Sequence, residues 1–218
     1  MQSFTEENYL KVIYHLSQLT DLPVQTNAIA ERIKTRAASV TDMLKKLADK
    51  KLIDYIKYQG VTLTDSGKVV ALGIIRKHRL WEVFLVEKLK FRWDEVHDIA
   101  EELEHVNSAA LVERLDDFLG FPKRDPHGDP IPDENGVFEP SQNIHLHEML
   151  KGDLAVMIGV SEHSSPFLKH LERLGLIIGI HIEILEITDY DGSVELMTDQ
   201  KKINISREVA QHILVEIK

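Results

Sequence analysis

The chain contains no cysteine among its 218 residues. Disulfide bonds, thiolate metal sites and cysteine nucleophiles are therefore excluded. No apolar run approaches the roughly 20 residues that a membrane-spanning helix needs, and residues 1–6 lack a basic segment followed by an apolar one, so we expect a cytoplasmic protein without a membrane partner. Nothing resembles a glycine-rich phosphate loop or a nucleophile triad, so we expect neither an enzyme nor a small-molecule substrate.

The 26 basic residues are outnumbered by 36 acidic ones, and the net charge of −10 alone argues against a nucleic-acid partner. The charges are segregated, however. Residues 31–51 hold seven Lys or Arg against three Asp or Glu, a local charge of +4. Residues 93–148 hold fifteen acidic residues against three basic ones, a local charge of −12. This separation is typical of a DNA-binding module joined to a cation-binding module.

The first third of the chain has the pattern of a winged helix-turn-helix. Ser3 and Glu6 form an S-x-x-E capping box, which predicts a helix from about Thr5, with Asn8 and Lys11 outside its apolar side. Thr26 is expected to cap a short helix that ends at Ile33, and a tight connection leads into a helix at 37–51. Two β-prone runs then flank residues 58–60 and predict a hairpin wing.

The outward face of the third helix combines small and polar residues near its start with lysines further along. Such a face suits base edges first and phosphates next, and Lys57 at the wing tip suits a phosphate. The candidate DNA-binding residues are Thr26, Arg36, Ala38, Ser39, Thr41, Asp42, Lys45, Lys46 and Lys57. The alternative is a small α+β fold of the same shape that does not bind DNA.

Two stripes of imidazoles and carboxylates follow on expected helices. His78 and Glu82 are four residues apart and share one helix face, and 97–105 carries a second stripe at i, i+4, i+7 and i+8. The members of the second stripe are His97, Glu101, Glu104 and His105. Charged stripes are commonly just solvated faces, but residues 93–106 hold six acidic residues and no Lys or Arg, so like charges repel. A divalent cation between the stripes would relieve that repulsion.

The remaining chain indicates three domains. A long apolar helix at about 68–89, with helices at 93–106 and 108–119, predicts a homodimer interface. Five of the seven prolines lie between 122 and 140 and mark an irregular connector, in which Asp125 and His127 are further candidate ligands. Short alternating runs after 146 predict a small β-barrel. We therefore expect a mainly α chain with a winged helix-turn-helix at 1–72, a helical dimerisation and metal-binding domain at 73–140 and a β-barrel at 146–218.

With these motifs in order, the chain resembles the diphtheria toxin repressor family of metal-dependent transcriptional repressors along its whole length. The segments that carry the resemblance are 76–80 (RKHRL), 96–106 and the proline loop 126–132. The resemblance implies a homodimer that binds a palindromic operator in double-stranded DNA and a C-terminal SH3-like domain. It also implies control of metal-uptake genes.

Position by position, the resemblance implies three ligand sets. An ancillary site corresponds to His78, Glu82 and His97, and a primary site to Asn8, Glu101, Glu104 and His105. Glu101 stands where iron-sensing members have cysteine, as in the manganese-sensing branch, but Asn8 and Lys11 stand where that branch has acidic ligands. A third set would comprise Glu82, Asp125 and His127, with Glu162 or His163.

Oxygen and imidazole ligands suit Mn²⁺ or Fe²⁺, and we expect Zn²⁺ and Co²⁺ to bind in vitro. Two alternatives remain open from the sequence. One is a constitutive winged-helix regulator in which the acidic helices only dimerise. The other is a metal-dependent hydrolase, which would need an open coordination position and a general base.

Overall fold

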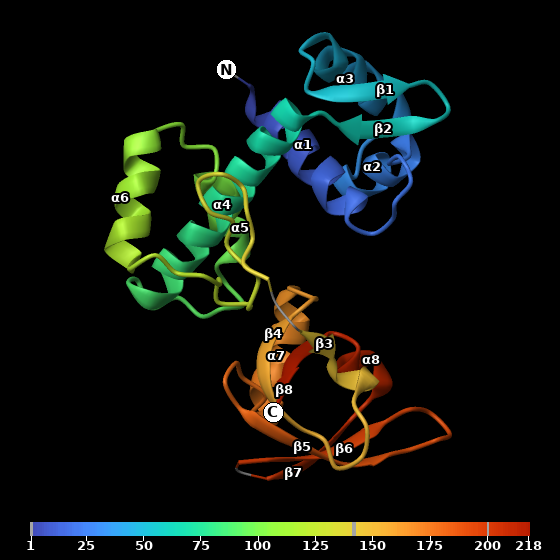
Figure 1. Ribbon diagram of the computed structural model, residues 1–218, viewed down its shortest axis with the longest axis vertical. Helices are drawn as coiled ribbons and strands as arrows, with labels where there is room; N and C mark the ends of the chain where they lie inside the picture. Colours follow the sequence, from blue (N-terminus) through green and yellow to red (C-terminus); the bar gives the residue numbers. More distant parts are fainter. Residues whose placement is uncertain (1, 141–142, 200) are drawn as a thin grey trace. The chain divides into compact units, whose positions relative to one another are not determined.

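The computed structural model describes residues 2–140, 143–199 and 201–218 (Figure 1). The helices are α1 (Phe4–Ser17), α2 (Thr26–Ile33), α3 (Ala37–Asp49), α4 (Asp65–Glu87), α5 (His97–Leu103), α6 (Ala109–Leu119), the 3-10 helix η1 (Leu146–Glu148), α7 (Ser165–Leu174) and α8 (Arg207–Ala210). The strands are β1 (Ile53–Ile56), β2 (Gly60–Leu63), β3 (Ile144–His145), β4 (Leu154–Val160), β5 (His181–Ile187), β6 (Val194–Thr198), β7 (Lys202–Ile205) and β8 (Ile213–Ile217). None of the described helices is long and apolar enough to cross a membrane.

The chain folds into two compact units whose boundaries cross α4, α5 and α6. The first unit comprises 1–78, 101–112 and 132–138. The second unit comprises 79–100, 113–131 and 139–218. Each unit has its own hydrophobic core and is described separately.

The first unit contains the predicted winged helix-turn-helix. The capping box at the start of α1 is present, with Ser3 Oγ accepting from the Glu6 amide and Glu6 Oε2 accepting from the Ser3 amide. Apolar residues of α1, α2 and α3 pack with those of the β1–β2 hairpin into one core. One expectation was wrong: Thr26 is the first helical residue of α2 rather than its cap, and Gln25 takes the cap position without a side-chain hydrogen bond to the helix amides. The extended backbone of Gln25 makes it the last residue outside the helix.

The wing is fixed by a glycine next to its turn. β1 and β2 pair antiparallel, with Ile56 opposite Gly60. Gly60 has a φ of +116°, and a Cβ there would lie 2.9 Å from the carbonyl oxygen of Val24. Val24 also pairs with Val61 through hydrogen bonds in both directions. Gly60 therefore lets the wing pack against the segment that precedes α2.

Helix α4 begins at Asp65, slightly before the start that was expected at about 68. Thr64 Oγ1 accepts a hydrogen bond from the Gly67 amide, which satisfies one of the unpaired amides of the first turn. A Cβ at Gly67 would lie 1.9 Å from the carbonyl oxygen of Leu52, so only glycine allows this approach. The 23 residues of α4 then carry His78 and Glu82 on one face.

The acidic segment was expected to be helical over 93–106, but α5 is shorter at both ends. Asp94 is buried and accepts from Arg92 Nε at 2.9 Å and from the hydroxyl of Ser165 at 3.1 Å. The ammonium of Lys169 lies 3.2 Å from Oδ2 of Asp94, the oxygen that also accepts from Ser165. These contacts with α7 and with Arg92 hold Asp94 in a turn, and the helix starts only at His97.

The C-terminal part of the second unit is a six-stranded antiparallel sheet with strand order β3-β8-β4-β5-β6-β7. Apolar residues of its strands form one core with Leu168 and Leu171 of α7. The connector at 125–131 packs closely on β4, because the amide of Val160 donates to the carbonyl of His127 at 2.9 Å. A Cβ at Gly128 would lie 2.1 Å from the carbonyl oxygen of Ile158. This backbone contact positions the polar residues of the connector.

Candidate metal centre

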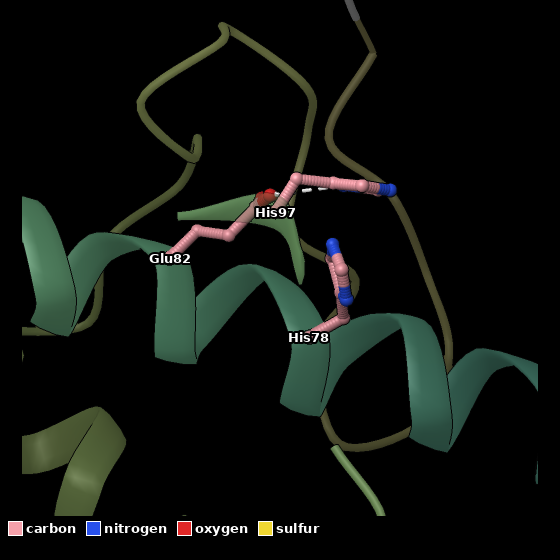
Figure 2. A group of neighbouring side chains, drawn as sticks. All are labelled: His78, Glu82 and His97. Atoms are coloured by element: carbon pink, nitrogen blue, oxygen red, sulfur yellow. Dashed lines mark ion pairs between the residues drawn. The ribbon is translucent and has the colours of Figure 1, made fainter. Parts of the chain in front are cut away.

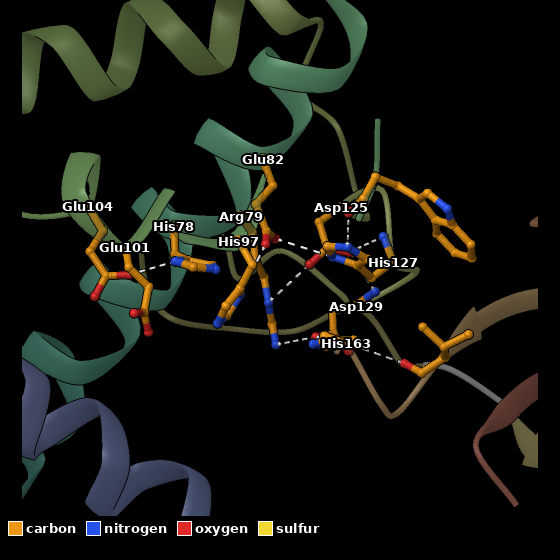
Figure 3. A network of polar contacts seen from close by, with 12 residues as sticks. His78, Arg79, Glu82, His97, Glu101, Glu104, Asp125, His127, Asp129 and His163 are labelled. Atoms are coloured by element: carbon orange, nitrogen blue, oxygen red, sulfur yellow. Dashed lines mark hydrogen bonds and ion pairs between the residues drawn. The ribbon is translucent and has the colours of Figure 1, made fainter. Parts of the chain in front are cut away.

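Glu82 is the central residue of the polar network on α4. Its side chain is 2% exposed, and its two oxygens face two different imidazoles. Oε1 lies 3.5 Å from Nδ1 of His97, and Oε2 lies 3.6 Å from Nδ1 of His127 (Figures 2 and 3). One carboxylate thus has an imidazole within reach of each oxygen.

His78 lies one helical turn before Glu82 on α4, as Figure 2 shows. Its Nδ1 is 2.6 Å from Oε2 of the fully buried Glu104, which fixes the orientation of the ring. Metal-binding imidazoles in proteins are typically oriented in this way by a carboxylate on their other nitrogen. Of the expected ancillary set, His78 and Glu82 lie on α4, and His97 is the first residue of α5. One potential ligand atom from each of the three lies within 4.8 Å of the others.

A second group consists of Glu82, Asp125 and His127, one potential ligand atom from each lying within 4.8 Å of the others. All three side chains are buried. Nε2 of His127 donates to the carbonyl of Trp93 at 2.7 Å, which leaves Nδ1 on the side of Glu82. Among the described residues, this Nδ1 is a buried nitrogen with no hydrogen-bond partner. A cation with Glu82 and Asp125 as co-ligands would satisfy it.

The loop that carries this second group is held by its own hydrogen bonds. Asp125 Oδ1 accepts from the amides of His127 at 2.8 Å and of Asp129 at 3.0 Å. Arg79 of α4 donates to the carbonyl of Pro130, and its guanidinium lies 3.7 Å from Asp125 and 3.3 Å from Asp129. Asp125 and His127 are therefore pre-positioned by backbone amides and by one arginine.

The electrostatics of the second group favour a cation. Burial and the charges of Asp129 and Glu82 raise the pKa of Asp125 well above its usual range. Burial lowers the pKa of His127, but the Glu82 carboxylate outweighs it and the net pKa is raised. The raised pKa values of Asp125 and His127 both indicate that carboxylates are buried here with too little positive charge nearby. A divalent cation would supply that charge.

His163 was expected as an additional member of this group, with Glu162 as the alternative. The His163 ring stacks on His127 at 4.8 Å between centroids, and its Nε2 lies 3.8 Å from Asp129. Burial lowers the pKa of His163 and so favours its neutral form. Glu162 instead accepts from the amide of Ser164 at 2.8 Å. His163 is thus the nearer of the two to the group.

The expected primary set is arranged differently from the ancillary one. Asn8 is exposed on α1, whereas the adjacent Glu7 is buried and contacts Nδ1 of His105 at 2.6 Å. Glu104 is bound by the ammonium of Lys11, at 2.6 Å and 2.8 Å to its two oxygens. The same ammonium lies 3.5 Å from Glu101.

Sequence reasoning missed the roles of Glu7 and Arg79, and although it placed Lys11 at a ligand position, it did not predict the ion pair of Lys11 with Glu104. A usable signal existed for Glu7 and Lys11, since they are four residues apart and therefore share a face of α1. Among the described residues, Glu101, Glu104 and His105 do not meet as a trio of ligand atoms within 4.8 Å. Their assignment as a metal site stays a prediction.

The candidate DNA-binding residues lie mostly on exposed faces. Thr26 and Thr41 are half-buried, and Thr41 donates to the carbonyl of Ala37 at 3.0 Å. Lys57 at the wing is exposed, with its ammonium 4.7 Å from the centre of the Tyr58 ring. The exposed members are Arg36, Ala38, Ser39, Asp42, Lys45, Lys46 and Lys57.

Three family models match successive parts of the chain. Residues 1–61 match the N-terminal DNA-binding domain of the iron-dependent repressors, and residues 64–133 match their metal-binding and dimerisation domain. Residues 144–217 match the FeoA domain. The matched segments follow one another in this order along nearly the whole sequence.

The chain is also similar to individual metal-dependent repressors over nearly its whole length. The iron-dependent repressor IdeR of Mycobacterium tuberculosis is 30% identical over 97% of this chain and 96% of the relative. The diphtheria toxin repressor of Corynebacterium diphtheriae is 26% identical over the same shares. A solved manganese-dependent transcriptional repressor in complex with manganese superposes with a TM-score of 0.89 at 36% identity, covering 98% of this chain and 100% of that one.

Proposed function

Because the chain belongs to the family of iron-dependent repressors, we propose that Glu82 and the side chains around it form the site at which it senses a divalent cation. One cation would be held by His78, Glu82 and His97, and another by Glu82, Asp125 and His127. The observation that carries this proposal is the Glu82 carboxylate, whose two oxygens face two imidazoles from different segments. Asn8, Glu101, Glu104 and His105 are the primary set that the resemblance implies, and in this chain Lys11 already contributes a positive charge there.

The protein is a metal-dependent transcriptional repressor with a DNA-binding domain and a dimerisation domain, and not an enzyme. The hydrolase alternative is therefore wrong, and the C-terminal domain is a FeoA domain. We propose the domain limits 1–72, 73–140 and 146–218. We also propose that the homodimer binds a palindromic operator, since paired winged modules match a two-fold-symmetric site.

The contacts with DNA would divide by residue type. The start of α3, with Ala38 and Ser39 exposed, would approach base edges, and Lys45 would reach phosphate. Lys57 would contact the backbone from the wing. Lys46 has a second contact, because its ammonium lies 3.0 Å from Glu6 of α1. Helix α3, the proposed recognition helix, is thereby tied to α1.

A bound divalent cation supplies concentrated positive charge to buried carboxylates. In its absence, the carboxylates of Glu82 and Asp125 are buried near Asp129 with Arg79 as the nearest permanent counter-charge. A cation that binds one arrangement of the dimer better than another shifts the population by that difference. A shift from 1:99 to 99:1 needs about 5.5 kcal/mol of preference.

Donor chemistry supports Mn²⁺ or Fe²⁺ as the activating metal. Every proposed ligand is a carboxylate or an imidazole, apart from the amide of Asn8, and the chain offers no thiolate. The affinity order of divalent metals favours Zn²⁺ and Co²⁺, so we expect both to bind in vitro as well. A repressor that responds to Mn²⁺ or Fe²⁺ suits the control of metal-uptake genes, and we expect it to act in the cytoplasm.

The test is operator binding by fluorescence anisotropy, with promoter DNA of metal-uptake genes from the protein's own genome. Wild type is titrated first in chelator and then with buffered Mn²⁺, Fe²⁺ and Zn²⁺. We expect tight binding only with metal. Glu82→Gln should need at least tenfold more free metal, whereas Glu87→Gln, at a half-exposed residue of the same helix, should behave as wild type.

Two results would contradict the proposal. A Glu82→Gln protein with the metal response of wild type would show that the sensing site is elsewhere. Equally tight binding in chelator would make the chain a constitutive winged-helix regulator whose acidic segments only dimerise.

A further inference from the structure

The ammonium of Lys11 lies among the carboxylates that were expected to hold a divalent cation. Its Nζ is 2.6 Å from Oε1 and 2.8 Å from Oε2 of Glu104, so it binds both oxygens of one carboxylate. It is also 3.5 Å from Oε1 of Glu101. The Lys11 side chain is only 11% exposed, and that of Glu104 is fully buried. This is an enclosed ion pair rather than a surface contact.

The charges around this pair are balanced. The Lys11 ammonium binds both oxygens of Glu104, and Nδ1 of His78 lies 2.6 Å from Oε2 of the same carboxylate. The carboxylate is therefore already compensated. A second cation at the same oxygens would have to displace the ammonium or meet its repulsion.

Helix α1 is fastened to the 101–112 segment by two pairs of opposite polarity. Lys11 on α1 meets Glu104, and Glu7 on α1 meets the next residue, His105, at 2.6 Å. The Phe4 ring stacks on His105 at 4.7 Å between centroids. The acidic Glu7 of α1 thus faces an imidazole, and the basic Lys11 of α1 faces a carboxylate. Two metal ligands from α1 would instead have placed acid against acid, with the metal between them.

We propose that Lys11 is a resident cation that replaces a divalent ion at Glu101 and Glu104. The chain then fastens α1 to these carboxylates without metal and keeps its metal response for the ligands around Glu82. Only the statement that the metal response lies with the ligands around Glu82 rests on the proposed function. It predicts fewer Mn²⁺ ions per chain than the ligand count suggests, because Asn8, Glu101, Glu104 and His105 hold none while Lys11 is present.

The experiment counts Mn²⁺ per chain by equilibrium dialysis of the full-length protein, with free Mn²⁺ read by electron paramagnetic resonance. Lys11→Met keeps the length of the side chain and removes its charge, and we expect it to bind one more Mn²⁺ per chain than wild type. Lys11→Arg keeps the charge and should keep the wild-type count. Adding Glu104→Gln to Lys11→Met should remove the extra ion.

Lys50→Met is the matched control. Lys50 also binds both oxygens of a buried carboxylate, that of Glu6, at 2.8 Å each, but it does not contact Glu104. It should therefore disturb the fold in a similar way to Lys11→Met while leaving the Mn²⁺ count unchanged. Circular dichroism of each variant in chelator establishes that it is folded.

A second measurement needs no variant. Amide hydrogen exchange of wild type in chelator should show α1 as protected as it is in Mn²⁺, because Lys11 and Glu7 hold it in both cases. Free exchange of α1 in chelator, or equal Mn²⁺ counts for wild type and Lys11→Met, would overturn the proposal. Neither result bears on Glu82, whose role fails separately if Glu82→Gln leaves the count and the operator response unchanged.

Discussion

Glu6 connects α1 to the recognition helix, and its replacement by glutamine should lower stability in a way that depends on pH. The Glu6 side chain is 1% exposed and contacts Lys50 at 2.8 Å and Lys46 at 3.0 Å. Burial alone would raise its pKa. The hydrogen bonds from Lys50, from the Ser3 amide and from Lys46 outweigh burial and lower the pKa from 4.5 to about 2.

The size of the effect follows from that shift. One pKa unit corresponds to about 1.4 kcal/mol of stability, so the shift has an upper limit of about 3 kcal/mol. The lysine side chains are 37% and 55% exposed, and solvent screening reduces the value to about 2 kcal/mol. A lowered folded-state pKa contributes stability above the unfolded-state value. This contribution is complete above about pH 4.5 and disappears as the pH falls through about 2.

The assay is urea unfolding of wild type and Glu6→Gln in chelator, followed by circular dichroism from pH 7 to pH 2. We expect Glu6→Gln to be about 2 kcal/mol less stable at pH 7, with the difference shrinking below pH 4.5. Asp42→Asn is the control, because the Asp42–Lys45 pair on the same recognition helix is exposed and contributes little. Equal stability at pH 7, or a difference that persists at pH 2, would refute this reasoning.

Three further predictions concern the loop at 125–131, its arginine and the wing. Arg79→Lys loses the forked contacts to Asp125 and Asp129, and it should weaken Mn²⁺ binding about tenfold in dialysis; unchanged affinity would deny Arg79 this positioning role. Gly128→Ala places a Cβ 2.1 Å from a carbonyl oxygen at a φ of +91°, so the thermal midpoint should fall by several degrees and by clearly more than in Gly152→Ala, which has the same φ but whose Cβ meets nothing within 4 Å. Lys57→Ala should weaken binding to all DNA sequences alike and lower the salt dependence by about one ion per lost phosphate contact, and a sequence-selective loss would contradict a phosphate role.

Local signals predicted much of the fold. The capping box of Ser3 and Glu6 is present, and it depends only on residues three positions apart. The wing was predicted from two β-prone runs around Gly60, whose positive φ the hairpin requires. These elements are encoded in short stretches, and such stretches can be interpreted without knowing what lies across the core.

Errors arose where a distant partner decides the local structure. The helix that was expected at 93–106 starts only at His97, because Asp94 forms an ion pair with Lys169, which is far away in the sequence. Lys11 was expected outside the apolar side of its helix, yet it is buried because Glu104 binds it. The sequence of α1 alone does not show that Lys11 pairs with a buried carboxylate 93 positions later in the chain.

Glu82 has one consequence for the shape of the response to metal. Its carboxylate faces an imidazole at each oxygen, so the two proposed cations would share a single negative charge. Two unit charges about 4 Å apart repel by roughly 4 kcal/mol at an effective dielectric of about 20, and two divalent ions at that separation repel more strongly still. Ordering one glutamate side chain in advance gains only about 2 kcal/mol. Repulsion is the larger effect, so the second ion should bind more weakly than the first, and occupancy should rise gradually over a wide range of metal concentration instead of switching at one threshold.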